Sequence, residues 1–262
     1  MNTIDKIFEI DKKKTVEKIT HFIRTYFNMA GVSKAIVGLS GGVDSSLTAM
    51  LTLNALGKDK IIGLILPSNI TPRRDIEDAK MMAEWLGINY HQIDITQIVE
   101  DFKKALNTSD KITIGNVMAR TRMILLYGFA NQYNGIVLGT GNKTELLVGY
   151  FTKYGDGGVD ILPIGDLYKT DVWNLAKYLD VPERIVKKTP SAGLWPGQTD
   201  EGELGLSYSL LDKILAGLVE LKLDKKQISE LLNTDIKIIE KVEQLIKQSE
   251  HKRNPPPIAK VR

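Results

Sequence analysis

The chain has 262 residues, 43% of them hydrophobic, with a net charge of +3. It contains no cysteine, which excludes disulfides, a thiolate zinc site, iron–sulfur ligation and a cysteine nucleophile within these residues. The last twelve residues hold four basic side chains and no acidic one, so the remainder is close to neutral and disfavours a nucleic-acid binder. A chain of this size can bury a substantial core as one large α/β domain or two small ones.

The amino-terminal residues mix acidic and apolar side chains and lack the continuous apolar stretch of a secretory signal. No window approaches the apolar length of a membrane span. We therefore expect a soluble cytoplasmic protein with no membrane partner. Apolar residues at helical spacing over residues 4–27 predict amphipathic helices at the start of the chain.

Four apolar segments then have the length and composition of strands, at residues 34–38, 60–66, 89–95 and 135–138. Each is followed by a helical or turn pattern, which predicts an α/β fold with a doubly wound parallel sheet and helices on both faces. After about residue 170 the pattern is helical, over residues 171–179, 182–187, 207–221, 225–232 and 235–249. We expect one domain over residues 1–250 and a basic, proline-containing tail over residues 251–262.

The segment after the first predicted strand reads Gly-Leu-Ser-Gly-Gly-Val-Asp-Ser-Ser. Paired glycines let the backbone approach a ligand closely, while serine hydroxyls and the start of the next helix offer donors to an anion. A glycine turn with a helix N-cap is the alternative. We predict a nucleotide-phosphate loop, whose members are Gly38, Leu39, Ser40, Gly41, Gly42, Val43, Asp44 and Ser45. Because it lacks the lysine of a Walker loop and carries Asp44 as a candidate metal ligand, γ-phosphoryl transfer is not favoured.

A second glycine-rich polar loop follows the fourth predicted strand and ends at Glu145. In a doubly wound sheet, ligands bind beyond the carboxyl ends of the strands where the strand order reverses. With the order 3-2-1-4, both loops would face one crevice, and Asp44 and Glu145 could share Mg²⁺ with the phosphates of ATP. Taken alone, Glu145 is equally well an exposed carboxylate at a helix start.

Two arginines, Arg120 and Arg122, lie on a helix predicted to run from residue 115 to about 131. Their spacing places them on different faces, so one can point into the crevice while the other is solvated. Residues 150–169 form a glycine-rich loop that carries both positive and negative side chains. Such a loop can bind an anion and accept a proton, and the alternative is a solvated turn region. Its charged members include Lys153, Asp156, Asp160 and Lys169.

A further loop over residues 189–201 is rich in turn formers, and its Ser191 could donate to a phosphate. At the end of the last helix, His251 and Lys252 are either ligand contacts or a charge complement to the helix terminus.

Together these segments resemble the ammonia-dependent NAD synthetases of the ATP pyrophosphatase superfamily. The motifs stand in the family's order: the loop at 38–45, Asn-Val-Met-Ala-Arg-Thr-Arg-Met at 116–123, Gly-Thr-Gly-Asn-Lys-Thr-Glu at 139–145, Lys-Tyr-Gly-Asp-Gly-Gly-Val-Asp at 153–160 and Thr-Pro-Ser-Ala-Gly-Leu at 189–194. The resemblance covers nearly the whole chain. It implies the adenine nucleotide alpha hydrolase-like fold and a homodimer with the dinucleotide site at the subunit interface. The implied reaction amidates deamido-NAD with ammonia through an adenylate, releasing AMP and pyrophosphate.

Specific roles for individual residues also follow from this resemblance. It implies ATP contacts from the 38–45 loop and from Thr140, Lys169 and Ser191, with Mg²⁺ on Asp44 and Glu145. Ser191 stands where relatives often have threonine, which keeps a hydroxyl. The implied deamido-NAD contacts are Arg120, Lys153, Asp160, His251 and Lys252. We assign catalytic roles to Asp44 and Lys169, and we name Asp156 as the acceptor of a proton from ammonium because it lies in the loop beside those contacts.

Two other interpretations remain open at this point. One is another ATP pyrophosphatase that adenylates a different carbonyl, such as a GMP synthetase-like or tRNA-modifying enzyme, although thiolating members typically need cysteines. The other is a non-catalytic nucleotide-binding regulator, against which the retained Asp44, Glu145 and Lys169 argue. Ammonia is the expected nitrogen donor because glutamine-using enzymes commonly carry a cysteine nucleophile.

Overall fold

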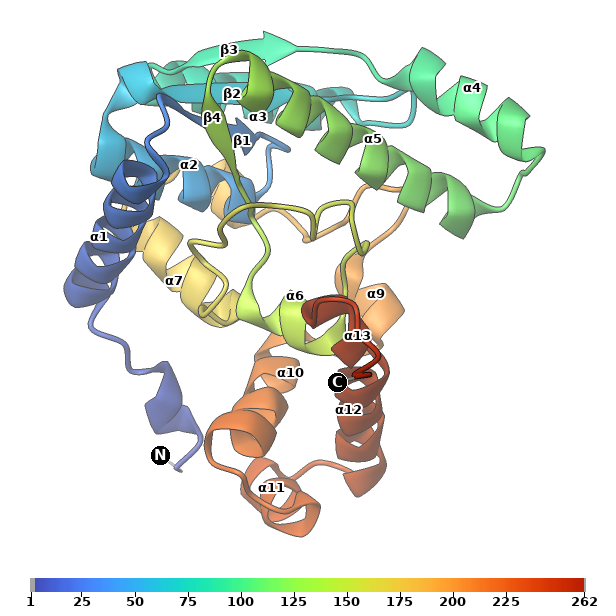
Figure 1. Cartoon of the computed structure of the whole chain (residues 1–262). Helices are drawn as coiled ribbons and strands as arrows, with labels where there is room; N and C mark the ends of the chain where they lie inside the picture. The colour runs from blue at the N-terminus through green and yellow to red at the C-terminus, as the bar shows by residue number, and fades with distance from the viewer. Residues whose placement is uncertain (1–2, 262) are drawn as a thin grey trace.

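Four parallel strands form the sheet, which lies in the upper part of Figure 1. The strands are β1 (Lys34–Gly38), β2 (Ile61–Ile65), β3 (Asn89–Gln92) and β4 (Gly135–Leu138). Their order, β3-β2-β1-β4, is the one that brings the loops after β1 and β4 to the same crevice. This computed structural model describes residues 3–261 of the chain.

Helices cover both faces of the sheet, and the strand residues alternate between the two cores. In β1, Ala35 and Val37 pack into the core beneath the first helical layer, while Ile36 packs into the opposite core. The first layer consists of α1 (Lys12–Ala30), α2 (Val43–Leu56), α3 (Arg73–Leu86), α7 (Lys169–Tyr178) and α8 (Glu183–Val186). The second consists of α4 (Thr96–Leu106) and α5 (Lys111–Gln132). The predicted doubly wound parallel sheet is confirmed.

The third strand is shorter than the sequence predicted, because it ends at Gln92 and not at Ile95. Ile93 and Ile95 still donate backbone hydrogen bonds to Ile65 and Pro67, at 2.9 and 2.8 Å. Between them, the Asp94 carboxylate accepts from the Thr96 amide at 2.8 Å, which begins α4 at that residue. An aspartate that turns the chain therefore breaks the strand pattern although the apolar alternation continues.

A helical region lies below the sheet in Figure 1 and encloses a third core. It contains η1 (Asp5–Phe8), α6 (Lys143–Val148), α9 (Asp200–Leu204), α10 (Tyr208–Leu215), η3 (Ala216–Glu220), α11 (Lys225–Leu232), α12 (Ile236–Gln248) and α13 (Glu250–Arg253). A short turn, η2 (Lys58–Lys60), precedes β2. The predicted helix over 207–221 is present as α10 followed by a π-helical turn. None of the helices in residues 3–261 has the length and apolar character to cross a bilayer.

Candidate functional site

A cavity of about 480 Å³ opens at the carboxyl ends of β1, β2 and β4. Its walls come from the loops after these three strands, from one side of α5, and from two long loops around residues 149–159 and 188–198. The sheet order therefore brings together segments that are more than 100 residues apart, and the cavity is large enough for a small-molecule substrate.

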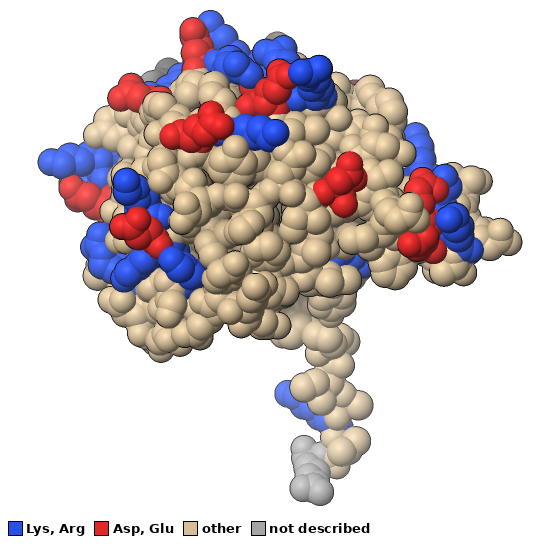
Figure 2. Space-filling model, turned by 90° about the horizontal axis from the view of Figure 1, so that it is seen from above, with Lys and Arg blue, Asp and Glu red and all other residues tan. Residues whose placement is uncertain are grey.

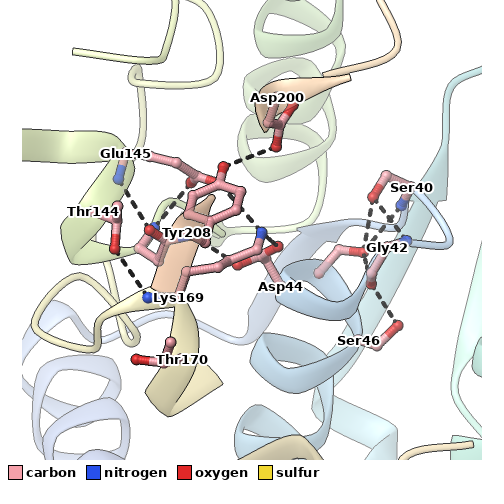
Figure 3. A network of polar contacts seen from close by, with 12 residues as sticks. Ser40, Gly42, Asp44, Ser46, Thr144, Glu145, Lys169, Thr170, Asp200 and Tyr208 are labelled. Atoms are coloured by element: carbon pink, nitrogen blue, oxygen red, sulfur yellow. Dashed lines mark hydrogen bonds and ion pairs between the residues drawn. The ribbon is translucent and has the colours of Figure 1, made fainter. Parts of the chain in front are cut away.

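The loop after β1 is held in a fixed shape by its own serines. The Ser45 hydroxyl accepts from the Ser40 amide at 3.2 Å and donates to the Gly42 carbonyl at 3.1 Å, while Ser46 donates to the same carbonyl at 2.8 Å (Figure 3). Gly41 has φ of +72°, and a Cβ there would lie 2.4 Å from the Asp75 carbonyl oxygen. Only glycine fits this turn, which leaves the first amides of α2 facing the cavity.

Three charged side chains meet between the loops after β1 and β4. The Lys169 ammonium lies 2.6 Å from an Asp44 carboxylate oxygen and 3.6 Å from a Glu145 oxygen (Figure 3). Lys169 is only 2% exposed, so burial opposes its charge, but the two carboxylates outweigh this and raise its pKa. The structure thus brings together Asp44, Glu145 and Lys169, which the sequence had placed in one site.

Asn142 supports both of these carboxylates. Its side-chain nitrogen donates to the Asp44 carboxylate at 2.9 Å, and its side-chain oxygen accepts from the Glu145 backbone amide at 3.0 Å. The Glu145 carboxylate in turn accepts from the Asn142 backbone amide at 3.2 Å, which completes a capping box at the start of α6. Burial, together with the nearby Asp44 charge, raises the pKa of Glu145. A cation beside this pair would relieve that penalty.

Asp200 is a further carboxylate of the cavity, and the sequence analysis did not identify it. It is 4% exposed, and one of its oxygens accepts from the Tyr208 hydroxyl at 2.9 Å (Figure 3). The other oxygen has no hydrogen-bond partner among the described residues. Burial raises the pKa of Asp200, and the charge of Lys169 opposes this. The acid-rich wall that it forms with Glu145 suits a cation.

Metal ligands are present in part. No group of three His, Asp or Glu side chains within residues 3–261 is arranged to hold a metal ion by itself. Asp44 and Glu145 nevertheless converge on one cation, Lys169, and Mg²⁺ is commonly held by one or two carboxylates with phosphate oxygens and water. The residues therefore fit a magnesium ion that takes its remaining ligands from a bound nucleotide.

Lys188 is a second cationic group at the cavity that sequence reasoning missed. Its ammonium lies 2.6 Å from Asp75 and 3.4 Å from the fully buried Asp78, and it donates to the Gly41 carbonyl at 3.0 Å. Asp78 also pairs with Arg184. This network ties the start of the loop over residues 188–198 to the phosphate loop. No local motif marks it, because its partners are 110 and 147 residues away in the sequence.

The loop over residues 149–159 brings Asp156 to the cavity wall. Its carboxylate accepts from the Thr152 amide at 2.9 Å, and burial raises its pKa despite the positive charges of Lys252 and Arg122. Arg122 lines the cavity and donates to the Leu66 carbonyl at 3.1 Å, whereas Arg120 is exposed. The expected division of the two arginines is therefore confirmed, with Arg122 as the inward one.

The residues predicted to contact deamido-NAD fall into two groups. Lys252 lines the cavity and donates to the Gly149 and Phe151 carbonyls, at 2.6 and 2.8 Å. The other four are not among the residues that line it: Arg120 donates to the Lys153 carbonyl, Lys153 to the His251 carbonyl, and Asp160 accepts from the Val137 amide. Thr140 and Ser191, predicted to contact ATP, both line the cavity, as does the 38–45 loop except for Gly41.

A scan against models of protein families matches residues 15–256 to the model described as NAD synthase. The chain belongs to the NAD synthase family. Among curated relatives, an NH(3)-dependent NAD(+) synthetase from Methanosarcina acetivorans is 50% identical over 95% of this chain and 98% of its own length. The protein of the same description from Pyrococcus horikoshii is 52% identical over 94% of each chain.

Solved structures of the family share the fold. An NMN synthetase from Francisella tularensis superposes with a TM-score of 0.86 at 36% identity, covering 96% of this chain and 99% of that one. An NH3-dependent NAD synthetase from Campylobacter jejuni, in complex with the nitrate ion, gives 0.83 at 32% identity, covering 96% of this chain and all of the other. The family fold therefore accounts for nearly the whole chain, including the helical region below the sheet.

Proposed function

We propose that this protein is an ammonia-dependent NAD synthetase, a ligase that converts deamido-NAD to NAD with ATP and ammonia. The observation that carries the proposal is the buried Lys169 held between Asp44 and Glu145 at the edge of a phosphate loop. A non-catalytic regulator has no use for such an arrangement, since burying a lysine between two partly buried carboxylates costs free energy that binding alone does not require. Family membership and the relatives at about 50% identity support the same activity.

In the first step, an oxygen of the nicotinate carboxylate attacks the α-phosphorus of ATP, and the bond to pyrophosphate breaks. The amides at the start of α2 and the Ser40 hydroxyl bind the phosphates, while Lys169 stabilises the negative charge that develops on them. When bound to Asp44 and Glu145, Mg²⁺ would supply further charge stabilisation on the same oxygens. Lys188 and Arg122 add positive charge on the cavity wall.

In the second step, ammonia attacks the acyl carbon and AMP leaves with the carboxylate oxygen. Ammonia is mostly protonated at neutral pH, so a nearby carboxylate has to accept a proton. Asp156 lines the cavity, and desolvation raises its pKa. We assign it this role.

We also propose that the protein acts as a homodimer in the cytoplasm. The apolar side chains of Phe22, Tyr26 and Met29 on α1 and of Ile124 on α5 are exposed. Figure 2 looks down on the molecule and shows a broad central area without charged side chains, and residues 123–142 contain none. An uncharged face with exposed aromatic residues is typical of a subunit interface.

The substrate itself is the point that an assay must decide, because one structural relative is named an NMN synthetase. Purified protein should release pyrophosphate from ATP with ammonium and deamido-NAD, and should prefer this substrate to nicotinate mononucleotide in kcat/KM. The opposite preference would make the mononucleotide the substrate. Pyrophosphate release that needs neither pyridine nucleotide would instead favour an ATP pyrophosphatase acting on another carbonyl.

A further inference from the structure

A buried carboxylate outside the cavity joins two of the three helices that carry the charged site. Asp212 lies on α10 with no exposed surface. One of its oxygens accepts from the Thr144 hydroxyl at 2.6 Å, and the other accepts from the Thr170 amide at 2.8 Å. Thr144 belongs to α6 and Thr170 to α7, so a single side chain contacts both helices from a third. Removing it would leave two buried donors unpaired.

Thr144 extends this contact to Lys169. Its hydroxyl donates to Asp212 and accepts from the Lys169 amide at 2.9 Å (Figure 3). The residue before α7 is Tyr168, and its side chain does not cap the helix, because its hydroxyl donates to Glu220 at 3.2 Å. The first two amides of α7 are therefore satisfied from other elements, Lys169 by Thr144 and Thr170 by Asp212.

This chain of hydrogen bonds meets the charged site at two points. Thr144 directly precedes Glu145 in α6, and Lys169 is the first residue of α7. A lysine side chain is long and has many rotamers, so the placement of its ammonium depends on a fixed backbone. Because Lys169 reaches Asp44 at 2.6 Å, a small shift of the start of α7 would change that contact directly.

We propose that Asp212, acting through Thr144, is a positioning residue that fixes the Lys169 ammonium relative to Glu145 and Asp44. Its two oxygens hold the starts of α6 and α7 in register, so the helical region below the sheet sets the geometry of a site at the sheet's edge. The catalytic part of this inference rests on the proposed function, whereas the structural part can be measured in the protein without substrate.

The test uses Thr144→Val, which keeps the side-chain shape and removes both hydrogen bonds, and Thr144→Ser, which keeps the hydroxyl. We expect Thr144→Val to lower kcat for pyrophosphate release by about 10- to 100-fold, with KM for ATP within a few-fold of wild type. Thr144→Ser should retain kcat within about threefold. Asp212→Asn, which cannot accept both hydrogen bonds, should behave like Thr144→Val and serves if that variant does not fold.

The matched control is Asp171→Asn, which neutralises another buried carboxylate at the start of α7. Asp171 accepts from the Tyr168 amide at 3.2 Å and does not contact Thr144 or the Lys169 amide. It should leave kcat near wild type. In a Lys169→Met background, Thr144→Val should cause no further loss of kcat, because both changes remove the same function.

Hydrogen exchange at the Lys169 and Thr170 amides gives an independent measurement without substrate. Both amides should exchange faster in Thr144→Val and Asp212→Asn than in wild type and Asp171→Asn. Unchanged exchange, an equal loss of kcat in Thr144→Ser and Thr144→Val, or additive losses in the Lys169→Met background would each overturn the inference. If wild type were inactive with every substrate, the proposed function would fail while the exchange result still decided whether Asp212 holds the start of α7.

Discussion

At the scale of single residues, the site is defined by charges that are buried together. Lys169 keeps its charge because Asp44 and Glu145 lie against it, and Glu145 in turn has a raised pKa because of burial and Asp44. Breaking such a group by removing one partner is far more costly than its net contribution to stability. Substitutions that keep shape and hydrogen bonding are therefore the informative ones.

Neutralising either carboxylate beside Lys169 should abolish most of the activity. Asp44→Asn and Glu145→Gln should each lower turnover by about 100-fold or more, the scale of losing one strong transition-state contact, while the protein still folds. Steady-state pyrophosphate release measures this, with circular dichroism to check the fold. Asp166→Asn is the control, because Asp166 is 96% exposed and lies in the loop that leads to Lys169. Near-normal turnover in folded Asp44→Asn would remove Asp44 from the mechanism.

Asp171 should make the stability of the protein depend on pH. Burial raises the pKa of its carboxyl from 3.8 to about 7, so between these values the native state binds a proton that the unfolded state has released. The contribution of Asp171 to the free energy of unfolding should thus fall as pH rises from about 4 to 7, at up to about 1.4 kcal/mol per unit. Urea unfolding of wild type and Asp171→Asn measures it, and parallel pH curves for the two would refute the assignment.

At the scale of elements, the sequence predicted what depends on local pattern. Continuous apolar runs marked β1, β2 and β4 to within one residue at each end, and the glycine–serine pattern located the tight loop between β1 and α2. The end of β3 was misplaced because Asp94 accepts a hydrogen bond from the Thr96 amide and turns the chain into α4, which apolar periodicity does not register. Lys188, Asp200 and Asp212 were missed because their roles come from partners that only the folded chain brings near.

Two segments, one in the cavity wall and one at the carboxyl end of the chain, should become ordered when substrates bind. Residues 150–159 are joined mainly by internal turns, and residues 254–261 are exposed beyond α13. We expect amide exchange in both to slow by at least tenfold when ATP and deamido-NAD are added together, since closure would keep water from the adenylate. Exchange in α11, far from the cavity, should stay the same. Unchanged exchange in both segments would exclude a closing role.

At the scale of the whole molecule, the sheet order, the long loops and the helical region combine to place one cavity at the carboxyl ends of the strands. The exposed cluster of Arg120, Lys153 and His251 lies outside its lining, joined by hydrogen bonds to backbone carbonyls. An assembly that brings a second subunit to this side of the molecule would give these residues a role that the single chain leaves open.

Assembly should therefore depend on the exposed apolar side chains of α1 and α5. Ile124→Glu introduces a charge into the uncharged segment 123–142 and should shift the protein from dimer to monomer at micromolar concentration in sedimentation velocity. Leu231→Glu, on α11 at the opposite end of the molecule in Figure 1, should leave the dimer intact. A wild-type protein that sediments as a fully active monomer would contradict the dimer proposal.

The central claim is that the nicotinate carboxylate is activated as an adenylate at the Asp44–Lys169–Glu145 site. Deamido-NAD labelled with ¹⁸O in its carboxylate tests this directly, because the attacking oxygen stays on the phosphorus when ammonia displaces AMP. Mass spectrometry of the products from ATP and ammonium should find one labelled oxygen in each AMP and none in pyrophosphate. Formation of ADP with the label in inorganic phosphate, or of NAD together with unlabelled AMP, would contradict the account.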